Sequence, residues 1–361
     1  MAYILGIKAI LITPSFLIQK VGSGAWVTVM ISAVLGFLGL WGWMLWTRAT
    51  ENMAFVPAVR RTLGRLLGDL IVTVLLTSFI FATAMNARLF AGGAVVGLLP
   101  QFPIEVLLVL TLGASAYTAW LGLEHVAKAA IFFFWPTIIS IVGLIIASSK
   151  ALDARNVLPV FGLGVSKVIV EGFRAVGLWG LVPVFAFLKS YVSDERALGK
   201  GACKGLLFAS LGLTLTVLTI LMFFPYPAST RLAHPVGTLA RAVYAGRFLQ
   251  RLEAAFTFTW FFASAVQISF SYMYVLIVLS QLANAHTYRP FMPGLISLFF
   301  GLAVLPTDIF KASVLVNRLF FDSLGIVCVL LGWVLFAIAK VRGIEGEVSN
   351  EESVGSSQGR A

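Results

Sequence analysis

Long apolar runs alternate with short charged or Gly/Pro-containing stretches along almost the whole chain. A helix needs about 20 apolar residues to cross the hydrocarbon core of a bilayer. Reading for such runs gives ten candidates: residues 3–18, 25–46, 69–88, 104–122, 127–148, 168–187, 205–224, 256–282, 292–306 and 320–339. The pattern predicts an all-α integral membrane protein with about ten transmembrane helices, folded as one polytopic domain over residues 1–342.

Composition supports a membrane protein and argues against a soluble one. Of the 361 residues, 60% are hydrophobic and only 11% are charged, whereas an average soluble domain has about 25% charged residues. The net charge of +11 comes from basic residues between apolar runs, where a lipid bilayer rather than nucleic acid is the expected partner. Residues 343–361 are polar and predict a disordered tail.

The distribution of Lys and Arg favours an N-terminus and a C-terminus on the inner side by a narrow margin. One span fewer would place the C-terminus on the opposite side. The sequence contains no GxSxG, HExxH or P-loop motif and no paired intramembrane carboxylates, and its three histidines are far apart. We therefore expect no enzyme activity, no cofactor and no metal site.

Two of the predicted spans contain helix-breaking residues in their apolar runs. The first has Gly6-Ile7-Lys8 and Thr13-Pro14, and the sixth has Gly177 and Gly180, followed by Pro183. If ten spans form two repeats of five, these interruptions occupy corresponding positions. Paired, interrupted helices indicate a binding site at the membrane midplane. The alternative is that the glycines only let helices pack closely.

A few polar residues within the spans are candidates for ligand contact. Lys8 would cost about 2.5–3.5 kcal/mol at the bilayer centre, so it either faces the site or extends to the inner interface. Gln267 and Ser271 lie one helical turn apart on a shared face, and they contact either a ligand or a neighbouring helix. The predicted ligand-binding residues are Gly6, Lys8, Ser78, Gly177, Trp179, Gly180, Gln267 and Ser271.

Charged residues outside the spans suggest further roles. The connection over residues 225–250 is too long for a tight turn and is either a solvated loop or a gate or partner surface, for which Arg241, Arg251 and Glu253 are candidates. Glu171 and Arg174 are spaced as a surface ion pair. Residues 60–67 suggest the end of a basic surface stretch, and Asp69, Glu105 and Asp322 suggest anions at helix starts.

Several motifs together resemble a known family. They are residues 235–241 (PVGTLAR), residues 246–256 (GRFLQRLEAAF), Trp260 and residues 267–271 (QISFS), with GAW at 24–26, GLE at 122–124 and LPV at 158–160. The chain resembles spore germination proteins of the GerAB type, the B subunits of nutrient germinant receptors. The resemblance covers nearly the whole hydrophobic chain, and the run from Arg251 to Glu253 is its most specific part.

The resemblance implies a fold and a function. The family is similar to amino-acid permeases of the APC superfamily, which have a five-plus-five inverted repeat with broken helices one and six. A B subunit would lie in the inner membrane of the spore with an A subunit and a lipoprotein C subunit, bind a small nutrient such as an amino acid, and trigger germination. The alternative on the same fold is a proton-coupled amino-acid transporter. Only five residues precede Gly6, fewer than in the family, so either the start codon is misassigned or this half-helix is absent.

Overall fold

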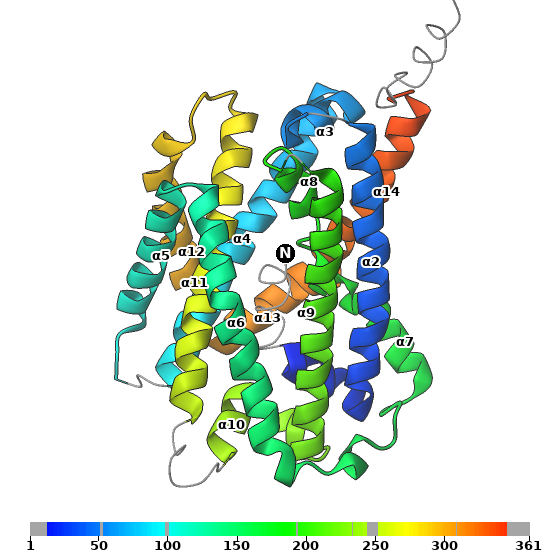
Figure 1. Ribbon diagram of the computed structural model, residues 1–361, viewed down its shortest axis with the longest axis vertical. Helices are drawn as coiled ribbons and strands as arrows, with labels where there is room; N and C mark the ends of the chain where they lie inside the picture. Colours follow the sequence, from blue (N-terminus) through cyan, green and yellow to red (C-terminus); the bar gives the residue numbers. More distant parts are fainter. Residues whose placement is uncertain are drawn as a thin grey trace, which may run out of the picture.

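The computed structural model describes residues 13–50, 53–97, 101–192, 194–232, 234–243, 252–307 and 309–344. Side chains at residues 96–97, 252–255, 309–310 and 319–322 are not described. The described residues form helices and connecting turns without a strand, and Figure 1 shows a bundle with α10 at one end and α3 and α8 at the other. The predicted all-α class is therefore confirmed.

Six helical stretches are long and apolar enough to cross a membrane. They are Thr13–Ala49, Arg65–Val95, Leu123–Ala151, Val165–Lys189, Glu195–Phe223 and Phe256–Leu282, with shorter apolar helices at Ile104–Trp120, Arg289–Val304 and Gly325–Val341. The protein is thus a multi-pass membrane protein. The full set of ten spans stays a prediction, because most of the first expected span, residues 3–18, lies outside the described residues.

The helices follow the apolar runs, with some shifts at their ends. Their bounds are α2 Ala25–Ala49, α3 Phe55–Leu63, α4 Arg65–Gly97, α5 Ile104–Trp120, α6 Leu123–Ser148, α7 Val165–Arg174, α8 Val184–Lys189, α9 Glu195–Phe223, α10 Pro235–Ala242, α11 Leu252–Leu282, α12 Met292–Val304, α13 Ile309–Val316 and α14 Gly325–Val341. The 3₁₀-helix η4 covers Ala175–Trp179, the π-helix η7 covers Asn317–Leu324, and residues 13–21 are also helical. The last expected span, residues 320–339, therefore begins within the π-helix.

The expected basic surface stretch at residues 60–67 is corrected. Helix α3 ends at Leu63, and Gly64 has a φ of 85°, a left-handed conformation that glycine adopts without strain. The chain turns there, so Arg65 and the two residues after it open the membrane span α4. Only the first part of the stretch belongs to the short amphipathic helix.

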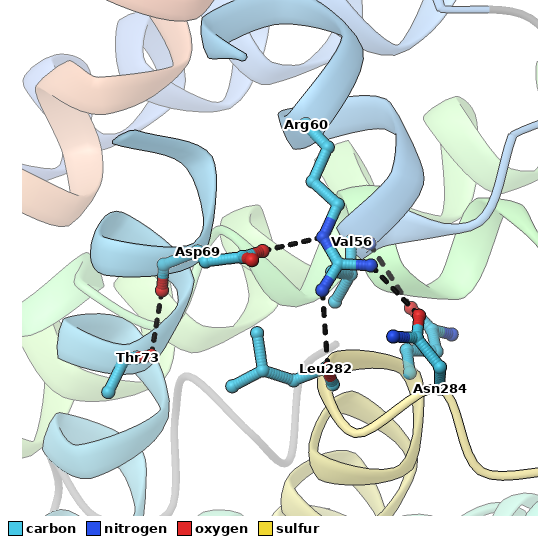
Figure 2. A network of polar contacts seen from close by, with 7 residues as sticks. Val56, Arg60, Asp69, Thr73, Leu282 and Asn284 are labelled. Carbon is cyan, nitrogen blue, oxygen red and sulfur yellow. Dashed lines mark hydrogen bonds and ion pairs between the residues drawn. The ribbon is translucent and has the colours of Figure 1, made fainter. Parts of the chain in front are cut away.

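Asp69 also differs from its expected role at a helix start. It is the fifth residue of α4, and its Oδ1 lies 2.5 Å from Nε of Arg60. Figure 2 shows that the Arg60 guanidinium also donates to Oδ1 of Asn284, at 3.0 Å, and to the carbonyl of Leu282, at 3.2 Å. One side chain of α3 thereby joins the start of α4 to the end of α11.

The helices differ in how much of their surface lies inside the protein. In an 18-residue apolar stretch of each span, 78% of the residues are buried for the spans that contain α11 and α7–α8, whereas 11% are buried for the span that contains α6. Large side chains such as Phe132 and Trp135 of α6 are exposed, as expected for a lipid-facing helix. The interior elements that can form a site are therefore α11 and the interrupted segment from α7 to α8.

Candidate functional site

The sixth expected span is interrupted in its middle. Helix α7 ends at Arg174, η4 follows, and α8 begins only at Val184. The amide of Gly180 donates to the carbonyl of Gly177 at 3.0 Å, and the amide of Val182 donates to that of Trp179 at 2.9 Å. These bonds span three residues rather than four, as in a 3₁₀-helix. The predicted interruption at Gly177–Gly180 is confirmed.

Helices α2 and α14 pack closely against the interrupted part of this span. The Trp179 side chain is fully buried, and its indole N–H lies 3.3 Å from the hydroxyl of Ser32 in α2. A Cβ at Gly36 would lie 2.7 Å from the Trp179 ring, and one at Gly180 would lie 2.5 Å from Cα of Gly325 in α14. The contacts of Trp179 and Gly180 are thus with α2 and α14, and small residues make this close packing possible.

Helix α11 presents a buried polar face. Trp260, Ser264, Gln267, Ser271 and Tyr274 recur every three or four residues, and each is less than 7% exposed. Residues at this spacing share one side of a helix, so the predicted shared face of Gln267 and Ser271 is buried. At about 1.5 Å of rise per residue, this face extends for about 21 Å.

Three side chains on this face carry polar atoms without partners. Among the described residues, Nε1 of Trp260, Nε2 of Gln267 and the hydroxyl of Tyr274 are buried and make no hydrogen bond. A buried polar group that lacks a partner costs about 1–3 kcal/mol, so such groups in a native protein indicate a water molecule or a ligand. The α11 face could therefore hydrogen-bond a small polar molecule.

The C-terminal part of this face packs against α4 and against α8, which ends the interrupted span. The ring of Tyr274 lies with its centroid 4.4 Å from that of Phe79 in α4 and 5.0 Å from that of Phe187 in α8. Ser78, which was predicted to contact the ligand, is buried, and its hydroxyl donates to the carbonyl of Val74 in its own helix at 2.7 Å. The structure thus brings α4, α8 and α11 together around Tyr274.

The other predicted site residues are not shown at the α11 face. Gly6, Lys8 and Arg251 lie outside the described residues, as does the side chain of Glu253. Arg241 is exposed at the end of α10. The pKa of His234 is lowered from its ordinary value by burial and, to a smaller extent, by the Arg241 charge.

The surface ion pair expected between Glu171 and Arg174 is corrected in one respect. The pair exists, with Nη1 of Arg174 2.9 Å from Oε1 of Glu171. Glu171 is nevertheless buried, because Lys20 of the helical residues 13–21 covers it and lies 2.9 Å from its Oε2. No local sequence signal links Lys20 to Glu171, because the two are far apart along the chain.

Arg88 is a candidate that sequence reasoning missed. It was taken as the end of the third span, but α4 continues to Gly97, and Arg88 is only 7% exposed. Its Nη2 donates to the carbonyl of Thr307 at 3.4 Å, while its buried Nε has no partner among the described residues. The sequence does contain a signal for this, because the apolar run continues after Arg88 and so puts its charge inside the span. Charges within a span are costly and usually functional.

Comparisons with known proteins agree on one family. A family described as "Spore germination protein" matches residues 1–311. The chain is also 22% identical over 237 residues to "Spore germination protein A2" of Bacillus subtilis (strain 168), a match that covers 65% of this chain and 65% of that relative. Within the described residues, no group of three or more His, Cys, Asp or Glu could hold a metal ion.

Proposed function

Because the chain belongs to the spore germination protein family, we propose that it is the transmembrane subunit of a spore nutrient germinant receptor. In this role it binds a small nutrient such as an amino acid and triggers germination, without catalysing a reaction. It lies in the inner membrane of the spore beside receptor A and C subunits. Its ten spans form a five-plus-five inverted repeat of the APC type, in which the helical residues 13–21 belong to the first broken helix.

This proposal rests on the buried donors of α11 that have no partner. Helix α11 packs beside the interrupted span. Among the described residues, the amide nitrogen of Gln267 and the hydroxyl of Tyr274 are buried without partners, and the adjoining span is interrupted at Gly177–Gly180. An interrupted helix frees backbone groups, which can be tolerated in a membrane only where protein or a polar cavity covers them. In this site the nutrient side chain lies against α11, where it would pair with these donors, and the nutrient carboxylate lies near Gly177. For a signal to follow, the nutrient must favour one conformation over another.

The test is the substitution Gln267→Leu, which removes the amide while keeping much of the volume. Because the amide nitrogen has no partner among the described residues, its loss should leave the melting temperature of the purified protein unchanged or raised. The nutrient concentration that gives half-maximal germination should increase up to about tenfold, the upper end of what the loss of one hydrogen bond to the nutrient side chain produces. Germination by a non-nutrient agent that acts downstream should be unchanged.

Ser269→Ala is the matched control on the same helix. The Ser269 hydroxyl donates to the carbonyl of Ala265 at 2.7 Å, within α11, so its removal should leave the nutrient response as in the wild type. If spores with Gln267→Leu contain normal amounts of the protein and respond to every nutrient at wild-type doses, the α11 face is not the site.

A proton-coupled amino-acid transporter is the second candidate, because an interrupted span is also the architecture of solute carriers. Reconstituted in liposomes, a transporter would accumulate labelled amino acids in response to a pH gradient, whereas a receptor subunit would bind them without accumulation. Genes for A and C subunits beside this one would favour the receptor. Accumulation that a proton ionophore abolishes would favour the transporter.

A further inference from the structure

Three cations follow one another along the first part of α9. Arg196, Lys200 and Lys204 are spaced four residues apart, and all three side chains are exposed. Each step of four residues turns about 40° further round a helix, so the three share one side, which is about 12 Å long. Within the part of the chain that the structure describes, none of them forms a salt bridge. We call these three residues the α9 basic face.

The carboxylates near this face are engaged elsewhere. Oε1 of Glu195 lies 2.6 Å from Nζ of Lys189, at the end of α8. Oδ1 of Asp194 accepts from a backbone amide in the first turn of α9 at 3.0 Å. In α6, which contacts α9, Glu124 pairs with Lys128 at 2.7 Å. The α9 basic face is therefore left without an acidic partner among the described residues.

The same side of α9 continues as an apolar surface after Lys204. It carries large apolar side chains that are each 47–51% exposed: Leu207, Phe208, Leu211 and Leu215. With the cations, they fall within an arc of about 120°. The opposite side of the helix packs inside the protein through residues such as Leu206 and Leu213. Figure 1 shows α9 running from the end of the bundle with α3 and α8 towards the end with α10, so the cations lie at one end and the apolar residues nearer the middle.

This order of charge and hydropathy matches one leaflet of a bilayer. Acyl chains cover the exposed apolar part of a span, and the headgroups lie where the hydrocarbon ends. Long basic side chains at that level reach the headgroups while their methylene stems stay in apolar surroundings. Helix residues four apart have Cβ atoms about 5–6 Å from each other, so two of these cations can contact one phosphate. A free phosphate would explain only the cations, whereas a phospholipid explains both the cations and the apolar residues after them.

We propose that the α9 basic face binds the phosphate of an anionic phospholipid, whose acyl chains lie along the exposed apolar residues that follow it. The proposal requires only that the protein spans a membrane, and it is independent of the receptor function. Because Glu195 joins the start of α9 to Lys189, the lipid binds to the helix that contacts the end of the interrupted span.

Three probes separate the charge of the lipid from its acyl chains. Dioctanoyl phosphatidylglycerol has two chains and a net negative headgroup, dioctanoyl phosphatidylcholine has the same chains and no net charge, and glycerol 3-phosphate has no chains. Native mass spectrometry of the full chain, released from micelles of an uncharged detergent, measures the binding of each. Phosphatidylglycerol should bind at least about tenfold more tightly than phosphatidylcholine, since each cation near a surface contributes about fivefold. Glycerol 3-phosphate should show no binding at the same concentrations.

Two double variants assign the binding to the α9 basic face. Lys200→Gln with Lys204→Gln should weaken phosphatidylglycerol binding by about 25-fold, which is about fivefold for each cation. Lys340→Gln with Arg342→Gln is the matched control, because it removes two exposed cations at the end of α14, at the same end of the bundle. Residues two apart do not share a helix face, so this control should bind phosphatidylglycerol as the wild type does. Melting temperatures check that both variants are folded, and the three probes on the wild type test the charge requirement if one is not.

Several results would overturn the proposal. They are binding of phosphatidylcholine or glycerol 3-phosphate as tight as that of phosphatidylglycerol, no binding of phosphatidylglycerol to the wild type, or equal weakening in the two double variants, which would indicate net charge alone. Wild-type binding of phosphatidylglycerol by the folded Lys200→Gln, Lys204→Gln variant would also contradict it. If that variant in addition no longer co-purified with a receptor A subunit, the α9 basic face would belong to an acidic protein partner instead.

Discussion

Arg60 connects three helices through one guanidinium. It reaches Asp69 of α4 and, at the end of α11, the carbonyl of Leu282 and the side chain of Asn284. Asn284 itself has a φ of 51°, a left-handed conformation that Asn tolerates at a helix end. A planar, forked guanidinium suits this set of acceptors, and a lysine ammonium would reach fewer of them.

Arg60→Lys should therefore destabilise the protein although it keeps the charge. The expected loss is about 1–3 kcal/mol of unfolding free energy, because more than one charge-assisted hydrogen bond is lost at a partly exposed site. Arg61→Lys is the matched control, since the described contact of Arg61 is a 3.9 Å approach to the sulfur of Met53, and it should change stability by less than about 0.5 kcal/mol. Unfolding of both variants in denaturant measures the difference; equal losses would contradict the role of the Arg60 network.

The buried side chain of His234 should make the free energy of unfolding depend on pH. Its pKa in the folded protein is below its ordinary value of 6.5 because burial, and then Arg241, disfavour the charged form. Between the two pKa values the unfolded chain binds more protons than the folded chain, so the free energy of unfolding falls as the pH falls. The stabilisation that comes from keeping His234 neutral in the folded protein is present above pH 6.5. It is lost as the pH drops through the pKa of His234 in the folded protein.

His234→Gln removes this titration. Between about pH 7.5 and about pH 5, the melting temperature of the variant should therefore fall less than that of the wild type. Arg241→Gln should give an intermediate slope, because it removes the smaller of the two causes. Identical slopes for the wild type and His234→Gln would show that His234 does not contribute.

At the scale of elements, glycines of α2 decide how closely the interrupted span can approach. Gly36→Ala would place a Cβ 2.7 Å from the buried Trp179 ring, so either η4 or α2 must move. Overpacking of this kind costs about 1–3 kcal/mol. We expect lower thermal stability and, because the contact between α2 and η4 changes, a changed nutrient dose response in spores.

Gly113→Ala in α5 is the control for replacing a helix glycine by alanine where no neighbour is close. A Cβ there meets no atom within 4 Å, and alanine is a better helix former than glycine by about 1 kcal/mol. The melting temperature of this variant should equal or exceed that of the wild type. If Gly36→Ala behaves in the same way, the contact between α2 and Trp179 is looser than the structure shows.

The positions of most elements could be predicted because each one follows from local sequence. A bilayer requires a certain length and hydropathy of every span independently of the others, so the apolar runs located α2, α6 and α11 closely. The interruption of the sixth span followed from Gly177, Gly180 and Pro183 in the same way. The end of the third span was wrong because Arg88 was taken as a boundary, whereas a buried charge can lie within a helix that its neighbours cover.

For the whole molecule, the sequence by itself determined the membrane class, the family motifs, the interrupted span and the polar periodicity of α11. Tertiary structure alone decided that Lys20 meets Glu171, that Arg60 meets α11, and that Trp179 and Gly180 lie against α2 and α14. The physical reason is that bilayer insertion acts on each helix separately, whereas helix association depends on the close approach of small residues and on a few polar contacts. Glycines and polar residues occur in many spans, and only their juxtaposition across the fold shows which of them meet.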